Sequence, residues 1–195
     1  MEKVKIYDLA IPYEKIYRNV KYHRLEFKTG KLRLILQKNC KDDKYKVDKI
    51  LERHKNWIYN NAKAIEDAKD YAKNNAMNNL VKKRGIRKLN AIVIHYVKKF
   101  SDEINTEVKH LCFRKMVSKW GSCSANGKIT FNTYLKYLPE ELIQYVVFHE
   151  VLHLKEKNHS KKFWEITGEK FKNHKVYEKE MLAYGFLMEK RHIKF

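Results

Sequence analysis

The feature that most constrains this chain is an apolar helical segment that begins at Pro139 and carries two histidines four residues apart. Proline suits the first position of a helix because its missing N–H would have no partner there. The segment is predicted to run to about Lys155 and contains His149-Glu150-Val151-Leu152-His153. Residues four apart share one helical face, so both imidazoles can point at the same ion. Glu150 lies about a hundred degrees further around the helix, where its carboxylate can reach a water beside the ion without ligating the metal.

A third histidine, His159, follows His153 by six residues, past a polar stretch that lets the helix end and the chain turn back. His-Glu-x-x-His alone is expected by chance in about one in 30 such chains, and requiring this third histidine lowers the figure to about one in several hundred. Three neutral imidazoles leave one position of a tetrahedral zinc ion open to water, which is typical of catalytic sites. The alternatives are that His149 or His153 is a partly buried core residue, or that the metal site has lost its activity.

The remaining pattern predicts both strands and helices. Alternation of apolar and polar residues predicts a β-hairpin from residues 22–28 and 31–37 with Thr29-Gly30 as its turn, and strands over residues 110–117 and 128–132. Apolar spacing of three and four predicts helices over about 47–65, 89–100, 160–171 and 176–190. The first pattern continues weakly to Leu80, either as one long helix or as two helices with Asn74-Asn75 as the break. Ser160 fits a helix N-cap.

Positive charge is concentrated in the first half of the chain. The formal net charge is +20, and residues 1–100 hold 26 lysines and arginines against 11 acidic residues, whereas residues 101–195 hold 17 against 12. One interpretation is docking to nucleic acid or another polyanion. The other is that a lysine-rich composition leaves solvated faces with no partner.

Several classes of protein are excluded by composition. With 44% hydrophobic residues the chain can form a packed core, so it is not wholly disordered. No apolar run approaches the roughly 18–20 residues of a membrane span, which predicts no membrane partner, and acidic residues interrupt the N-terminal segment, which predicts no secretory signal. Cys40, Cys112 and Cys123 are odd in number and contain no Cys-x-x-Cys, which favours a reducing cytoplasm over a disulfide framework. Nothing indicates an oligomeric state.

Further motifs surround the histidines. They are Trp120-Gly121-Ser122-Cys123, Ile129 and Asn132, Leu138-Pro139, Tyr145–Leu154, Asn158-His159-Ser160 and Phe163-Trp164. Together they resemble the YgjP-like metallopeptidase family. The ligand spacing is also similar to that of WLM metalloproteases and, more distantly, to that of SprT-type proteases, some of which act on DNA-bound proteins.

The resemblance implies an α+β fold with a zincin-like (minigluzincin-like) catalytic core, in which a small antiparallel sheet packs on helices. We expect this core over residues 86–195, preceded by a basic N-terminal β-hairpin and helical region over residues 1–85. It also implies a zinc-dependent peptidase that acts on peptides or proteins, with His149, His153 and His159 as ligands and Glu150 as general base. The alternative is a nucleic-acid-associated metalloprotein, either a protease for DNA-bound proteins or a binding protein with a structural zinc.

Other residues near the expected cleft have less specific roles. Zincin-like folds pair an edge strand with extended substrate, which makes Trp120 and Asn132 candidate substrate-binding residues. Core packing of Trp120 and turn capping by Asn132 are the alternatives. The candidate roles of Cys123 are a second metal contact, a redox-active thiol and a buried free thiol. The candidates for stabilising an oxyanion are Arg114, His174 and Tyr177.

Overall fold

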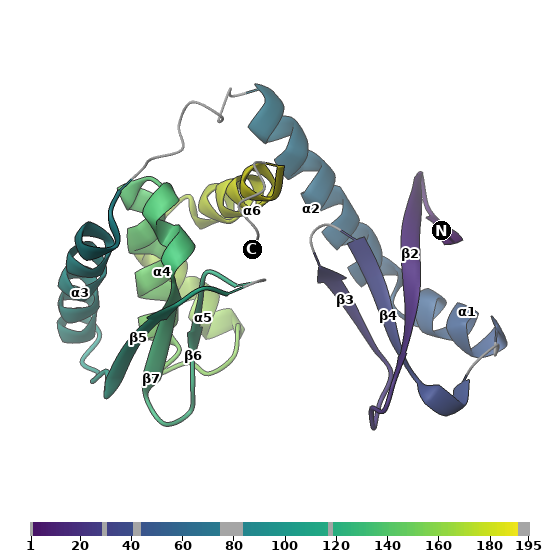
Figure 1. The fold of residues 1–195 in the computed structure, drawn as a ribbon, viewed down its shortest axis with the longest axis horizontal. Helices are drawn as coiled ribbons and strands as arrows, with labels where there is room; N and C mark the ends of the chain where they lie inside the picture. The colour runs from purple at the N-terminus through teal and green to yellow at the C-terminus, as the bar shows by residue number, and fades with distance from the viewer. Residues whose placement is uncertain (1, 29–30, 41–43, 75–83, 117–118, 191–195) are drawn as a thin grey trace. The chain divides into compact units, whose positions relative to one another are not determined.

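The computed structural model describes residues 2–28, 31–40, 44–74, 84–116 and 119–190. The chain divides into two compact units, Met1–Asp70 and Tyr71–Phe195, and each is described by itself (Figure 1). The division falls inside helix α2 (Lys55–Asn74). The domain boundary predicted between residues 85 and 86 comes just after residues 75–83, which lie outside the described residues, so it stays a prediction. Among the described residues, no helix combines the length and the apolar character that crossing a membrane requires.

The first unit is built on a four-stranded sheet with the order β1-β2-β4-β3. Its strands are β1 (Glu2–Ile6), β2 (Leu9–Arg18), β3 (Arg24–Lys28) and β4 (Lys31–Gln37). The predicted hairpin is confirmed, because β3 and β4 pair antiparallel; its turn at Thr29-Gly30 lies outside the described residues. The β1–β2 hairpin was not predicted. Its turn places Tyr7 at φ 53°, without the glycine or asparagine that usually marks a turn of this kind.

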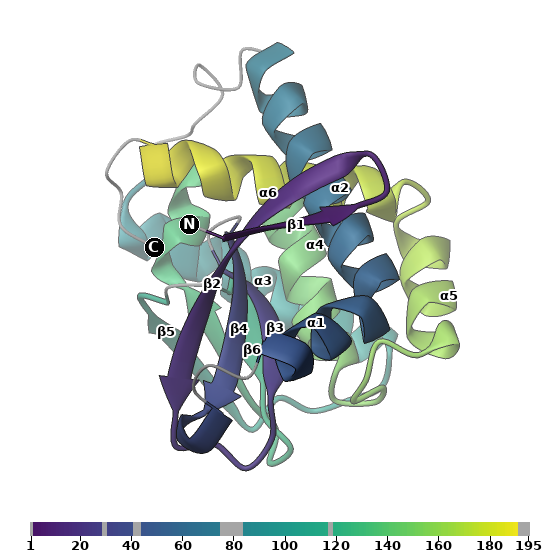
Figure 2. The same cartoon turned by 90° about the vertical axis from the view of Figure 1, so that its right-hand side faces the viewer.

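Two helices and a short 3-10 helix (Lys38–Cys40) complete this unit. The predicted helical pattern is divided at His54 between α1 (Lys44–Arg53) and α2, as the ribbon in a second view shows (Figure 2). Trp57 is 42% exposed, although its spacing predicted an inward position, whereas its neighbour Ile58 is fully buried. The helices and the sheet share one core, formed by Ile6, Ile11, Tyr13, Leu32, Leu34, Leu36, Val47, Leu51 and Ile58.

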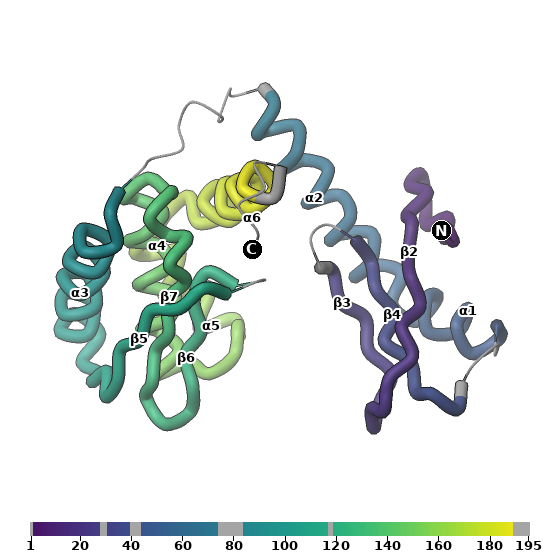
Figure 3. The backbone as a smooth tube through the Cα atoms, viewed as in Figure 1, coloured from purple at the N-terminus to yellow at the C-terminus, as the bar shows by residue number. Residues whose placement is uncertain are grey.

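The second unit combines a three-stranded sheet with the helices α3 to α6, and Figure 3 traces its backbone. Its elements are α3 (Ile86–Glu103), β5 (His110–Arg114), β6 (Gly121–Cys123), β7 (Lys128–Asn132), a 3-10 helix (Thr133–Tyr137), α4 (Glu140–Leu152), α5 (Lys161–Lys170) and α6 (His174–Lys190). The predicted α+β class is therefore confirmed. The sheet, with order β5-β7-β6, is mixed rather than antiparallel as expected, since β5 pairs parallel with β7 and β6 antiparallel.

Helix α4 is the centre of the second unit. It is apolar around its whole circumference, as a helix surrounded by other elements must be, and its buried side chains include Leu142, Ile143, Val147 and Val151. Pro139 is its N-cap rather than its first residue. The helix ends at Leu152, earlier than the predicted Lys155. The N–H groups of Lys155 and Glu156 both donate hydrogen bonds to the Leu152 carbonyl, which closes the helix end.

Candidate metal centre

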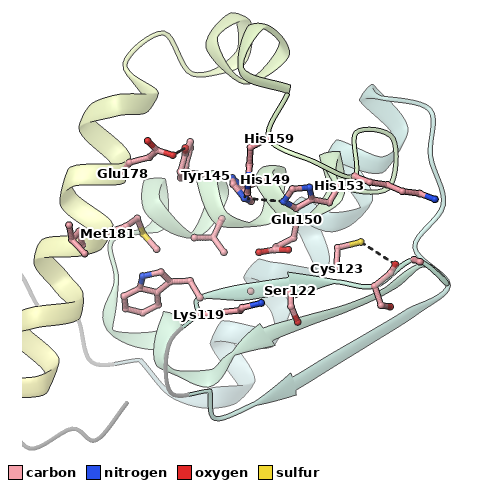
Figure 4. A pocket seen from close by; sticks show the side chains of 17 residues that line it. Lys119, Ser122, Cys123, Tyr145, His149, Glu150, His153, His159, Glu178 and Met181 are labelled. Atoms are coloured by element: carbon pink, nitrogen blue, oxygen red, sulfur yellow. Dashed lines mark hydrogen bonds between the residues drawn. The ribbon is translucent and has the colours of Figure 1, made fainter. Parts of the chain in front are cut away.

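The structure brings the three predicted histidines together at the C-terminal end of α4 (Figure 4). His149 lies in the last turn of the helix and His153 is its C-cap. The prediction that His153 lies inside the helix is therefore wrong. His149 Nε2 lies 3.2 Å from His153 Nε2 and 2.9 Å from His159 Nε2. Among the described residues, these three histidines form the one cluster of donor atoms, all within 4.8 Å of one another, that could hold a metal ion.

The protonation of the cluster suits metal binding. His153 Nδ1 donates a hydrogen bond of 3.0 Å to the Glu156 carbonyl, and since a carbonyl can only accept, the His153 Nε2 that faces the other rings carries the lone pair. Burial lowers the pKa of His149 to about 3, with a smaller contribution from its two histidine neighbours. Burial also lowers the pKa of His159. Neutral imidazoles at neutral pH are the state in which histidines bind metals.

Aromatic packing from α5 holds the rings in place. Phe163 is fully buried, and its ring centroid lies 4.8–4.9 Å from those of all three histidines. Trp164 stacks on His159, with centroids 5.4 Å apart and planes at 21°. Helix α5 begins directly after His159 because the Ser160 side chain caps it, accepting a hydrogen bond from the Phe163 N–H. The N-cap predicted at Ser160 is therefore confirmed, and it places His159 beside its aromatic supports.

Glu150 enters the same site from the last turn of α4 and lies against β6. It is 7% exposed, and burial raises the pKa of its carboxyl group to about 7, although nearby Lys119 and a hydrogen bond from the Cys123 N–H both lower it. A Cβ atom at Gly121 would lie 2.5 Å from Glu150 Cγ and 2.6 Å from Oε1. Residue 121 must therefore be glycine for the carboxylate to occupy this position. The sequence pattern around Gly121 did not predict this requirement.

A cavity of about 690 Å³ opens in front of the histidines and Glu150, and all of its lining residues belong to the second unit. One side is the segment from Lys119 through β6 to Ala125, and another is α6, with Glu178, Met181 and Leu182. An open cavity with a few convergent polar groups is the usual form of a substrate site.

The two candidate substrate residues differ in position. Trp120 is half-buried and lines the cavity. Asn132 is fully buried and does not line it. Its side chain donates to the carbonyls of Met116 and Lys119 and accepts from the N–H groups of Met116 and Tyr134. These bonds fit the alternative role of capping the following turn and holding the loop before β6, so we propose no substrate contact for Asn132.

The remaining four candidates differ in whether they line the cavity. None of Arg114, His174 and Tyr177 is among the residues that line the cavity. His174 does stack on Trp164, with centroids 5.5 Å apart, and is thereby one ring removed from His159. Cys123 lines the cavity as a half-buried free thiol, but it does not belong to the histidine cluster.

The donor set fits a zinc ion. Two nitrogens bound to one tetrahedral zinc at about 2.0–2.1 Å lie about 3.3 Å apart, close to the two separations within the cluster. Three imidazoles, one of which has its second nitrogen bonded to a backbone carbonyl, are the ligand chemistry and the outer-shell bonding expected for zinc.

Comparison with known proteins gives two kinds of similarity. Two solved structures are metallopeptidase zymogens. Abylysin from Pyrococcus abyssi is 23% identical, with a TM-score of 0.44, over 47% of this chain and 93% of that chain. Jannalysin from Methanocaldococcus jannaschii is 27% identical, with a TM-score of 0.39, over 51% of this chain and 88% of that chain. No curated protein matches the chain.

The model of one protein family, described as the YgjP-like metallopeptidase domain, matches residues 66–184. The match contains the histidine cluster, Glu150 and the whole lining of the cavity, and it starts in α2, well before the motifs on which the resemblance was based. It covers more than half of the chain, and it confirms a metal-dependent hydrolase of peptide bonds. The chain belongs to the YgjP-like metallopeptidase family.

Proposed function

We propose that this protein is a zinc-dependent peptidase in which His149, His153 and His159 hold the metal and Glu150 is the general base. The observation that carries the proposal is the convergence of three imidazole nitrogens and one desolvated carboxylate on a single open cavity. Family membership supports metal-dependent peptide hydrolysis. The choice of zinc rests on the all-imidazole donor set.

Zinc bound by this cluster would lower the pKa of a water molecule toward about 7 and polarise the carbonyl of the scissile bond. Glu150 would accept a proton from the attacking water on its carboxylate and pass it to the nitrogen of the leaving amine. Its raised pKa suits both steps, because a base that must also act as an acid works best with a pKa near the working pH. Phe163 and Gly121 keep the ligands and the base in position.

An extended substrate can bind along β6. This strand is at the edge of its sheet and pairs only with β7 among the described strands, and its three residues line the cavity. Addition of a peptide strand to such an edge uses backbone hydrogen bonds and requires little of the substrate sequence. Trp120, directly before β6, would contact the side chains of a substrate bound in this way.

The test separates the metal from the base. Glu150→Gln is expected to retain stoichiometric zinc and lose zinc-dependent cleavage of an unfolded protein such as casein, because the amide cannot accept the proton. His159→Ala is expected to lose zinc as well as activity. A Glu150→Gln variant that cleaves at the wild-type rate would overturn the role of the base, and His159→Ala with unchanged zinc would overturn the ligand assignment.

A second candidate function is binding to nucleic acid. The supporting observation is the outer face of α3, where Arg87, Lys88, Lys98 and Lys99 are all exposed. In this alternative the protein acts on DNA-bound proteins, or binds nucleic acid with zinc in a structural role. Counterion release then predicts binding to a generic duplex that weakens steeply as salt is added.

We also propose a cytoplasmic location, which the free thiols of Cys112 and Cys123 support.

A further inference from the structure

The cavity contains a second carboxylate, Glu178, which the proposed reaction does not use. Glu178 lies on α6, and Figure 4 shows it on the side of the cavity formed by that helix, with Met181. It is not part of the histidine cluster, so we assign it no role as a metal ligand. Its side chain is exposed to the open space of the cavity.

A tyrosine, rather than a cation, holds this carboxylate. Tyr145 Oη donates to Glu178 Oε1 over 3.4 Å. Tyr145 is itself 4% exposed and stacks on Tyr177, with ring centroids 5.4 Å apart and planes at 13°. The phenol therefore has little freedom to move, and its hydrogen bond keeps the carboxylate directed along the α6 wall.

Among the described residues, no positive group forms an ion pair with Glu178. Within the described part of the chain, no lysine, arginine or histidine nitrogen lies within 4.0 Å of its carboxylate. His174 and Lys175, on the same helix, act on it only from a greater distance. The cavity lysines Lys119 and Lys157 come from other segments, and Lys119 interacts with Glu150.

The Glu178 carboxylate is therefore partly desolvated, and no cation in the described part of the chain lies close enough to form an ion pair with it. The protein atoms around the carboxylate raise its pKa, and this effect outweighs the opposing effects of His174, Tyr145 and Lys175. A partly desolvated charge at the wall of an open cavity is stabilised when a ligand brings the opposite charge close to it.

We infer that Glu178 binds a positively charged nitrogen of the substrate and makes the cavity selective for peptides that carry one. This inference rests on the proposed peptidase function. The nitrogen belongs either to a free α-amino group or to a lysine or arginine side chain. Met181 and Leu182 on the same wall offer apolar surface for the methylene groups of such a side chain.

The experiment measures binding without turnover. Zinc-loaded protein with Glu150→Gln is titrated calorimetrically with neutral alanine- and leucine-containing octapeptides, in which a single lysine or its uncharged counterpart norleucine is placed at each position in turn. Each peptide is made with a free and with an acetylated N-terminus, so that the two sources of the cation are distinguished. We expect one cationic position to increase affinity about tenfold, the usual scale of a charge-assisted hydrogen bond.

Three further variants in the same background assign the effect to Glu178. Glu178→Gln is expected to remove the tenfold preference while the affinity for neutral peptides changes less than about twofold. Tyr145→Phe is expected to reduce the preference without removing it, because the carboxylate keeps its charge and loses its oriented hydrogen bond. The matched control is Glu169→Gln, the same change of charge at an exposed residue of α5 that does not line the cavity, and it should keep the full preference.

The outcomes separate this inference from the proposed function. Equal affinity for charged and neutral peptides, no binding of any peptide, or a cationic preference that survives Glu178→Gln would each overturn the role of Glu178. The proposed function is judged independently, by zinc-dependent cleavage with Glu150 present. A protein that cleaves peptides but shows no effect of Glu178→Gln refutes only the inference made here.

Discussion

Replacement of Glu150 by glutamine should make the metal-free protein more stable at neutral pH, although it removes the proposed base. The carboxyl group is buried, and its pKa is raised from 4.5 to about 7. In the unfolded chain the same group ionises near its ordinary pKa. Above pH 7, therefore, the folded state holds a buried charge that the unfolded state hydrates freely. The pKa difference corresponds to about 3 kcal/mol, an upper value for the gain from Glu150→Gln.

The sign of the effect gives it a distinctive pH dependence. Between pH 4.5 and 7 the folded protein binds more protons at Glu150 than the unfolded chain does, so this group lowers stability as pH rises through that window. Below about pH 4.5 the carboxyl is protonated in both states, and the variant and the wild type should be equally stable. At pH 7.5 the variant should gain most of the 3 kcal/mol, equivalent to about 6–12 °C in Tm for a domain of 150–250 residues.

The assay is urea denaturation of chelator-treated protein at several pH values, followed by circular dichroism, with the exposed-site variant Glu169→Gln as control. Wild type and variant share all titrating histidines, so their difference isolates Glu150. In zinc-loaded protein the gain should shrink, because a nearby dication favours the ionised carboxylate. A variant no more stable than wild type at pH 7.5, or one equally stabilised at pH 4.5, would refute the reasoning.

Four further predictions test other parts of the site. Gly121→Ala brings a Cβ atom to 2.5 Å from Glu150 Cγ, so we expect denaturation to show a loss of about 1–3 kcal/mol and peptidase assays to show lower activity; a variant as stable and active as wild type would contradict this packing. Asn132→Ala leaves buried backbone groups without partners and should cost about 2–3 kcal/mol, whereas the exposed-site control Asn60→Ala should change stability by less than about 0.5 kcal/mol; similar losses for both would exclude the loop-holding role. Zinc at 100 times its dissociation constant should stabilise the wild type by about 2.7 kcal/mol and His159→Ala by far less, measured as zinc-dependent Tm; equal shifts would remove His159 from the ligand set. A fluorescent duplex should bind at low salt and dissociate as salt is raised if the α3 face docks nucleic acid, and the absence of binding at low salt would eliminate that function.

Local patterns account for the parts of the structure that were predicted correctly. Helical periodicity alone places His149 and His153 on one face of α4, and alternation alone indicates the β3–β4 hairpin. The cap at Ser160 follows from the chemistry of a single side chain. In each case residues close in the chain interact with one another, so short windows of sequence contain the necessary information.

These local patterns could not predict which strands pair with one another when the strands are not neighbours in the chain. The parallel pairs β2–β4 and β5–β7 join strands that are not neighbours in the chain. The alternation of apolar and polar residues in a strand does not indicate its partner or its direction, and the antiparallel arrangement implied by the family resemblance was wrong for β5 and β7. The break at His54 was missed because the apolar spacing continues across it.

By itself, the sequence determined which residues can form the metal site, because two histidines one helical turn apart and a third just past the helix end have few other places to meet. Tertiary structure alone decided what surrounds them: that residue 121 must lack a side chain for Glu150 to fit, that Phe163 touches all three imidazole rings, and that α6 brings Glu178 into the same cavity. The physical reason is that ligand spacing is a property of one continuous segment. Burial, pKa and cavity shape depend instead on atoms that distant segments bring together only when the chain has folded.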